Sequence, residues 1–155
     1  MGSDAATAPR FDSVTRYLCW DHSRLARLLE QVKDQVAEGR LKEARELYRS
    51  YDAGVSRHLR VEQELVYPLF EARTGITPGP TETLRQEHEQ VQHAVRMMRE
   101  GLAVLDVQGF EAGVRYLDET LPAHNSKEEH VLYPTMDAML TERERQTLSE
   151  RLQRE

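Results

Sequence analysis

Two stretches of the sequence repeat a histidine, a glutamate and a Tyr-Pro pair at the same spacing. HLRVEQELVYP begins at His58, and HNSKEEHVLYP begins at His124, 66 positions later. In each stretch the glutamate follows the histidine by four residues, which on an α-helix places both side chains on one face, about 6 Å apart along the axis. A lone histidine recurs at the same offset, in WDHSRL and in QEHEQV. Imidazole nitrogens and carboxylate oxygens bind transition metals, so the pattern predicts a metal site with six protein ligands: His22, His58, Glu62, His88, His124 and Glu128.

Long helices are the elements that must position these residues. Apolar residues recur at three- and four-residue spacing through most of the chain, and TGITPGP at residues 74–80 is the clearest break. We expect helices over about residues 13–38, 41–73, 81–106 and 110–140, and a short fifth helix that opens with the capping box TERE at Thr141. The short connections predict an all-α fold: an antiparallel up-down-up-down four-helix bundle, built from two repeated helical hairpins, plus the short C-terminal helix. Pro68 and Pro134 fall late in long helices, where we expect a kink.

On this interpretation the chain divides into three parts. Residues 1–11 are predicted to be a disordered leader, because MGSDAATAP has neither the apolar run of a secretion signal nor the myristoylation pattern. Residues 12–140 form the bundle, and residues 141–155 form the C-terminal helix, whose alternating charges indicate a solvated face. At 155 residues the chain suits one domain with a single core.

The six residues interrupt apolar stripes that would otherwise be continuous. His22, for example, stands between Leu18 and Leu25 on the first helix without any slip of the three- and four-residue spacing. We expect the stripes of the second and fourth helices to continue past the His–Glu pairs through Leu65 and Val131. The six polar side chains therefore face the core. Two buried carboxylates need a counter-charge, and no lysine or arginine occupies the stripes, which favours metal ions over hydrogen-bonded core histidines.

Composition excludes several classes of protein. A net charge of −6 argues against nucleic acid as a partner, because nucleic-acid-binding surfaces are usually basic. No apolar run approaches the roughly 18 residues of a membrane span, so we expect no membrane partner. A single cysteine, Cys19, permits no internal disulfide, and together with the lack of a secretion signal this indicates a cytoplasmic protein.

The lone histidines and the two H-x-x-x-E…YP segments resemble the hemerythrin-like (HHE cation-binding) domain family. The similarity covers nearly the whole chain, from Asp12 to about Leu140. It implies a four-helix bundle that holds a non-haem di-iron centre, with two iron ions bridged by oxide or hydroxide; manganese and zinc also suit such a donor set. It further implies how the two ions share the six ligands: His22 and His58 serve one iron, His88 and His124 serve the other, and Glu62 and Glu128 bridge both.

The resemblance also bears on function. Oxygen-carrying hemerythrins have a second histidine four residues after the one on their third helix, where this chain has Gln92. Its four-histidine, two-glutamate set is more similar to di-iron proteins that repair iron centres and handle nitric oxide, and to iron- and oxygen-sensing members. The expected function is to bind or react with O2, NO or peroxide in stress defence, iron-centre repair or iron handling. The alternatives are an oxygen or iron sensor or binding module that acts through a partner protein, and an oxygen or iron carrier. Enzyme, sensor and carrier share the same ligands, and monomer and dimer both stay open.

Four ring side chains and one cysteine near the motifs have less defined roles. His93 and His130 fall off the apolar stripes, so we expect both at the surface. Tyr67 and Tyr133 each follow a glutamate by five residues. They are either packed aromatics with the hydroxyl at the surface, or phenols that donate hydrogen bonds to the metal ligands or quench radicals. Cys19 has no counterpart at the repeat offset and is expected to be a small core residue.

Overall fold

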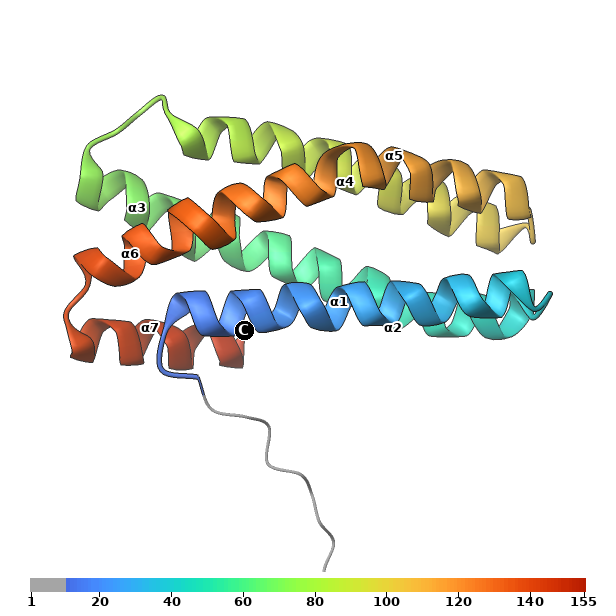
Figure 1. Ribbon diagram of the computed structural model, residues 1–155, viewed down its shortest axis with the longest axis horizontal. Coiled ribbons are helices and arrows are strands. Elements are labelled where there is room, and N and C mark those ends of the chain that lie inside the picture. The colour runs from blue at the N-terminus through green and yellow to red at the C-terminus, as the bar shows by residue number, and fades with distance from the viewer. Residues whose placement is uncertain (1–10) are drawn as a thin grey trace, which may run out of the picture.

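The structure is a computed structural model that describes residues 11–155. Long helices run back and forth along one axis, and no strand occurs in this part of the chain (Figure 1). The helices are α1 (Val14–Ala37), α2 (Leu41–Val61), α3 (Tyr67–Thr74), α4 (Pro80–Ala103), α5 (Val107–Lys127), α6 (Tyr133–Met139) and α7 (Glu142–Arg154). Two π-helical turns, η1 (Glu62–Val66) and η2 (Glu128–Leu132), join α2 to α3 and α5 to α6.

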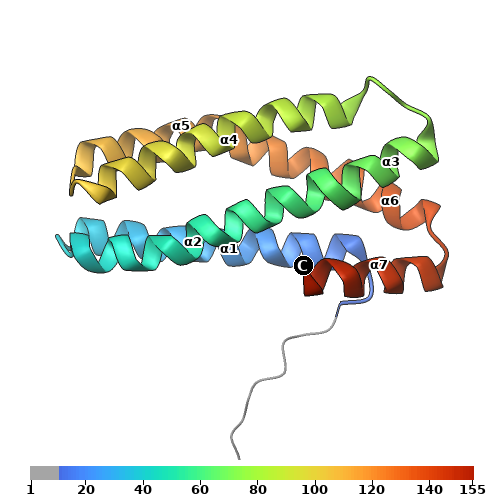
Figure 2. The same ribbon diagram turned by 180° about the vertical axis from the view of Figure 1, so that it is seen from behind.

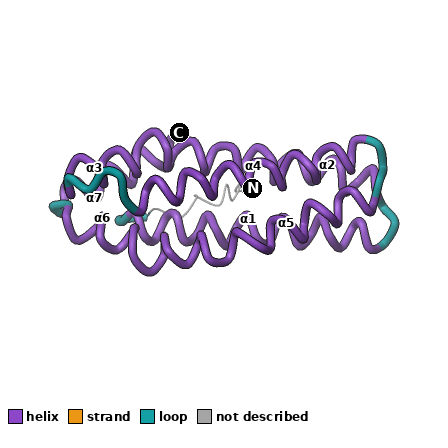
Figure 3. The backbone as a smooth tube through the Cα atoms, turned by 90° about the horizontal axis from the view of Figure 1, so that it is seen from above, coloured by secondary structure: helices purple, strands orange, loops and turns teal. Residues whose placement is uncertain are grey.

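The helices form the predicted antiparallel four-helix bundle. α1 packs against α2, α4 packs against α5, and α2 packs against α4. α2 runs through η1 into α3, and α5 runs through η2 into α6, so each of these composite helices is one long rod of the bundle (Figure 1, Figure 2). The connections between the rods lie at the two ends of the molecule (Figure 3). The expected all-α fold class, with two helical hairpins and a short C-terminal helix, is confirmed.

Local signals in the sequence set several helix ends close to the predicted residues. Ser13 caps α1, because its side chain accepts a hydrogen bond from the backbone N–H of Arg16. Thr141 and Glu144 form the predicted capping box at the start of α7. α3 ends at Gly75, which has a positive φ of 69° that a residue with a side chain rarely adopts.

Each composite rod contains a π-helical turn directly before its Tyr-Pro pair, where the sequence predicts a kink. In η1 the backbone N–H of Tyr67 bonds to the carbonyl of Glu62, five residues back, and in η2 Tyr133 bonds to Glu128 in the same way. The next residue in each rod is a proline, which lacks the N–H needed for a regular α-helical bond. The wider turn adjusts the backbone before that proline.

The π turns shift the helix faces by one residue, which makes part of the predicted stripe wrong. Val131, predicted to face the core, is 61% exposed, and the neighbouring Leu132 is buried instead. Leu65 is likewise only half-buried, while Val66 is fully buried. Because a wide turn takes up one extra residue, the residue one position later occupies the inward place.

Two apolar clusters fill the bundle on either side of a polar middle. Along α1, Leu18 belongs to one cluster and Leu25 to the other, and His22 lies between them. Leu84 and Val91 divide α4 in the same way. The apolar packing above and below therefore fixes the height of the polar layer in the bundle.

α7 lies beside α1 at one end of the bundle (Figure 1). Leu152 is fully buried there, and the hydroxyl of Ser149 donates to the backbone carbonyl of Phe11 at 2.7 Å. Of the predicted disordered leader, residues 1–10 lie outside the described residues, and the ring of Phe11 packs against Trp20. None of the described helices combines the length and the apolar character needed to cross a membrane.

Candidate metal centre

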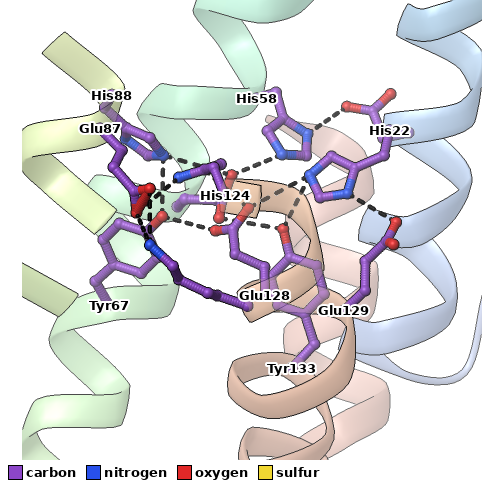
Figure 4. A network of polar contacts seen from close by, with 12 residues as sticks. His22, His58, Tyr67, Glu87, His88, His124, Glu128, Glu129 and Tyr133 are labelled. Carbon is purple, nitrogen blue, oxygen red and sulfur yellow. Dashed lines mark hydrogen bonds and ion pairs between the residues drawn. The ribbon is translucent and has the colours of Figure 1, made fainter. Parts of the chain in front are cut away.

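The six residues predicted to bind metal lie together in the middle of the bundle (Figure 4). The lone histidines come from α1 and α4, and the His–Glu pairs come from the junctions of α2 with η1 and of α5 with η2. His22 is 9% exposed, and the other five residues are at most 4% exposed. The repeated hairpin therefore brings six polar side chains to one buried place.

The donor atoms fall into two overlapping groups, each of which can hold a metal ion. Within a group, one ligand atom from each residue lies within 4.8 Å of all the others. Both groups contain the two glutamates, and they differ in their histidines. We call them the α1–α2 half, with His22 and His58, and the α4–α5 half, with His88 and His124.

Each of the four histidines turns its Nε2 atom toward the Oε1 atom of a glutamate. These Nε2–Oε1 distances are 2.6 Å for His58–Glu62, 3.1 Å for His124–Glu128, 3.4 Å for His22–Glu128 and 3.9 Å for His88–Glu62. The short His58–Glu62 contact lacks the alignment of a hydrogen bond, so Nε2 of His58 and both Oε1 atoms have no hydrogen-bond partner among the described residues. Buried polar atoms seldom lack a partner. Metal ions would satisfy these atoms, so the donor set fits a pair of them.

Electrostatics couple one histidine to one glutamate in the metal-free centre. Burial by itself lowers the pKa of His58, but the carboxylates of Glu62 and Asp21 outweigh burial and raise it to about 9. Burial likewise raises the pKa of Glu62, but the nearby His58 reverses this and lowers it to about 2. Burial lowers the pKa of His88 to about 4, so its ring is neutral at neutral pH. Without metal, His58 and Glu62 therefore form an ion pair inside the bundle.

Two buried tyrosines hold the outer oxygens of the glutamates. The hydroxyl of Tyr67 donates to Oε2 of Glu128 at 2.7 Å, and the hydroxyl of Tyr133 donates to Oε2 of Glu62 at 3.2 Å. Both tyrosines are fully buried, so a hydroxyl at the surface is ruled out and the donor interpretation holds. Burial, together with the Glu62 carboxylate, keeps the pKa of Tyr133 well above its ordinary value, so this phenol stays protonated.

Three further carboxylates surround the histidines, and the sequence analysis missed them. Asp21 accepts from Nδ1 of His58 at 2.9 Å, and Glu129 accepts from Nδ1 of His22 at 3.1 Å. Glu87 lies 3.7 Å from Nδ1 of His124, in the α4–α5 half. Asp21 and Glu87 each stand directly before a lone histidine, 66 positions apart, so the repeat itself carried a signal for them. Glu129 has no such signal.

The remaining residues singled out in the sequence do not belong to the two buried donor groups. His93 and His130 are exposed, as predicted. Gln92 is exposed as well. Cys19 is half-buried and packs at the edge of an apolar cluster, and burial together with the Glu129 carboxylate raises the pKa of its thiol to about 11.

A small cavity between α1 and α5 connects the histidines to the surface. Its volume is about 160 Å³, below the size of pockets that bind drug-sized ligands. Leu25 and Leu121 are among its apolar walls, and the buried His58 and His124 also line it. Glu30 and Lys33 also line it, with side chains that are 66% and 37% exposed. The cavity therefore suits molecules of a few atoms.

Comparison with known proteins identifies one family. The family model described as the hemerythrin HHE cation binding domain matches residues 15–136, a range that contains all six candidate ligands. A search of curated proteins and a search of solved structures each found no match.

Proposed function

Because the chain belongs to the hemerythrin HHE cation-binding domain family, we propose that it holds two iron ions and binds or reacts with O2, NO or peroxide. The observation that carries this proposal is the pair of buried donor groups that share both glutamates. Mixed imidazole and carboxylate donors suit iron, and manganese or zinc would also bind such a set. In this assignment each half would supply two histidines to one ion, and both ions would share Glu62 and Glu128.

The residues around the centre suit chemistry with small molecules. Bound iron would supply the redox chemistry that O2, NO and peroxide require. Four imidazoles and two carboxylates are few donors for two octahedral ions, which leaves positions for a small ligand. The apolar walls of the cavity, such as Leu25 and Leu121, favour small neutral molecules over ions, because an ion would lose its hydration there. Tyr67 and Tyr133 keep the glutamates oriented while such a molecule binds.

We propose stress defence, iron-centre repair or iron handling as the leading role. The second candidate is a sensor, which the contacts of one arginine favour. Arg57, the residue before His58, donates to the backbone carbonyl of Leu152 in α7 and to the hydroxyl of Tyr17, at 2.6 Å each. Metal binding at His58 would thus shift Arg57 and change the packing of α7, and a partner protein could bind the altered surface.

The metal stoichiometry tests the proposal. We expect two iron ions per chain after anaerobic reconstitution, measured by elemental analysis. Glu62→Ala and Glu128→Ala should each leave at most one weakly held ion, because each glutamate is assigned to both ions. His93→Ala and His130→Ala are matched controls on exposed residues and should keep both ions. One ion or none in the unmodified protein would refute the dinuclear centre.

Optical spectra distinguish the roles. The iron-loaded protein is mixed anaerobically with O2, NO or H2O2, and the spectrum is followed over many equivalents. Repeated consumption of the added molecule identifies an enzyme, whereas a stable adduct without turnover identifies a sensor or carrier. A sensor should also show altered amide hydrogen exchange in α7 when iron is loaded.

A further inference from the structure

The two halves of the centre differ in what supports their histidines. In the α1–α2 half, both Nδ1 atoms donate to carboxylates, at 3.1 Å to Glu129 and at 2.9 Å to Asp21 (Figure 4). In the α4–α5 half, neither Nδ1 atom has a hydrogen-bond partner among the described residues. Two carboxylates thus support one half, whereas in the other half Glu87 stays 3.7 Å from Nδ1 of His124, beyond hydrogen-bond distance.

The first cause of this difference is a break in the repeat at Glu129. The residue 66 positions earlier is Gln63. Glu129 reaches the lone histidine of α1 from the second position of η2, and Gln63 occupies the second position of η1. An amide has no charge with which to hold an imidazole N–H, and Nδ1 of His88 stays without a partner.

The second cause is a different use of the carboxylates that precede the lone histidines. Asp21 divides its oxygens: Oδ1 accepts from Arg24 at 2.8 Å, and Oδ2 accepts from His58. Both oxygens of Glu87, in contrast, bond to Lys127 at 2.9 Å. Lys127 thereby engages both oxygens of the carboxylate that lies beside the α4–α5 half, and Nδ1 of His124 makes no hydrogen bond to it.

A carboxylate that accepts from Nδ1–H fixes the ring of a metal-binding histidine and makes its Nε2 atom a stronger donor. Loss of such a partner typically weakens metal binding about 10- to 100-fold. Resting on the proposed di-iron function, we propose that the two ions are not equivalent. The α1–α2 half retains its ion, and the α4–α5 half holds the exchangeable one.

A difference in affinity between the two ions would allow the protein to release one of them selectively. One ion per chain can leave for an acceptor while the other stays and keeps the buried glutamates compensated. The exchangeable ion is the one that an iron-transfer or iron-sensing role requires.

Metal release tests the inference. The protein is loaded anaerobically with two equivalents of Fe(II), and an excess of a chromogenic Fe(II) chelator is added. We expect two release phases of equal amplitude, with rates that differ about 10- to 100-fold. Binding of a single ion would overturn the dinuclear centre and this inference with it. Binding of two ions that leave in one phase would overturn the inference alone.

Two isosteric variants assign the phases. Glu129→Gln removes support from the α1–α2 half and should accelerate the slow phase, leaving the fast phase unchanged. Gln63→Glu supplies the missing carboxylate to the α4–α5 half and should slow the fast phase. Gln108→Glu adds the same charge at an exposed position near the start of α5 and should change neither phase. Acceleration of the fast phase by Glu129→Gln, or release in Gln63→Glu that matches the control, would overturn the assignment.

Discussion

Tyr67 and Tyr133 connect the two hairpins at the level of single side chains. Each phenol comes from one hairpin and donates to the glutamate of the other, so the orientation of each proposed bridging carboxylate depends on the opposite repeat. The outer oxygen of each glutamate is held in this way, and the inner oxygen faces histidine Nε2 atoms, where a metal ion would bind. The phenols are therefore part of the ligand arrangement although they need not touch the ions.

Removing one phenol hydroxyl should lower the stability of the protein. Tyr67→Phe leaves a buried carboxylate oxygen without its donor, which should lower the free energy of unfolding of the metal-free protein by about 1–3 kcal/mol. Chemical denaturation measures this value. Tyr116→Phe is the control, because that half-buried ring packs beside the exposed His93, and it should stay within about 0.5 kcal/mol of the unmodified protein. Equal effects of the two changes would show that the Tyr67 hydroxyl has no structural role.

The thiol of Cys19 should be unreactive at ordinary pH. Burial and the Glu129 carboxylate raise its pKa to about 11, so at pH 8 only about one thiol in a thousand is ionised. Alkylation of the native protein should therefore be slow at pH 8 and should accelerate as the pH rises toward the pKa. Glu129→Gln should lower the pKa and speed the reaction, and unfolded protein gives the unshifted rate. Rapid alkylation of native protein at pH 8 would contradict the assigned environment.

The six candidate ligands could be found from the sequence because they are polar residues on apolar stripes and recur at one offset. The surrounding carboxylates were harder to find. Asp21 and Glu87 follow the same offset, but an acidic residue next to a histidine is common on helix surfaces. Glu129 reaches His22 from another helix, a contact that depends on the packing of α1 against the second hairpin.

At the scale of the elements, the π turns explain why the tyrosines could not be placed from the sequence. On a regular α-helix, a residue five positions after another points roughly 140° away from it. The extra residue of η1 is absorbed by the wide turn, which brings Tyr67 back toward the face of Glu62. The sequence indicated a disturbance through Pro68, and the resulting change of register became visible only in the structure.

α7 should detach when its main apolar contact is removed. Its buried residues are Ser149 and Leu152, so one leucine dominates its attachment. Leu152→Ala should cost about 2–5 kcal/mol in local stability. Hydrogen exchange should then show loss of amide protection in α7, while α4 and α5 keep theirs. The half-buried Leu148→Ala is the matched control and should have a smaller effect. Protection of α7 that survives Leu152→Ala would contradict this packing.

At the scale of the whole molecule, metal should contribute a large share of the stability. Ions that bind only the folded state stabilise it by about 4 kcal/mol when present at 1,000 times their Kd. For a chain of this size that corresponds to a fall in Tm of roughly 10 °C on chelation. Differential scanning calorimetry of loaded and chelated protein measures the difference. Equal Tm values at every pH would refute a core-facing metal site.

The difference should grow with pH. The pKa of His58 rises from 6.5 to about 9 on folding, so its contribution is complete below 6.5 and is lost as the pH rises through about 9. The pKa of Glu62 falls from 4.5 to about 2, so its contribution is complete above 4.5 and is lost only in strong acid. Burial lowers the pKa of His88 from 6.5 to about 4, so this histidine costs stability as the pH falls below 6.5. Metal-free protein should therefore be most stable near pH 6.5 and weaken toward pH 9. Chelation should lower Tm more at pH 9 than at pH 6.

The tyrosine of each hairpin contacts the glutamate of the other hairpin, and the two hairpins belong to one chain. This covalent linkage affects how the sequence of such a centre can evolve. Two separate copies of one hairpin, paired as a symmetric dimer, would bind two ions in identical surroundings, because symmetry makes every residue on one side equal to its mate. Joining the copies into one chain removes that constraint. Glu129 and Gln63, or Arg24 and Gln90, then vary independently. Covalent linkage of the halves is thus what would permit the two proposed ions to differ in function.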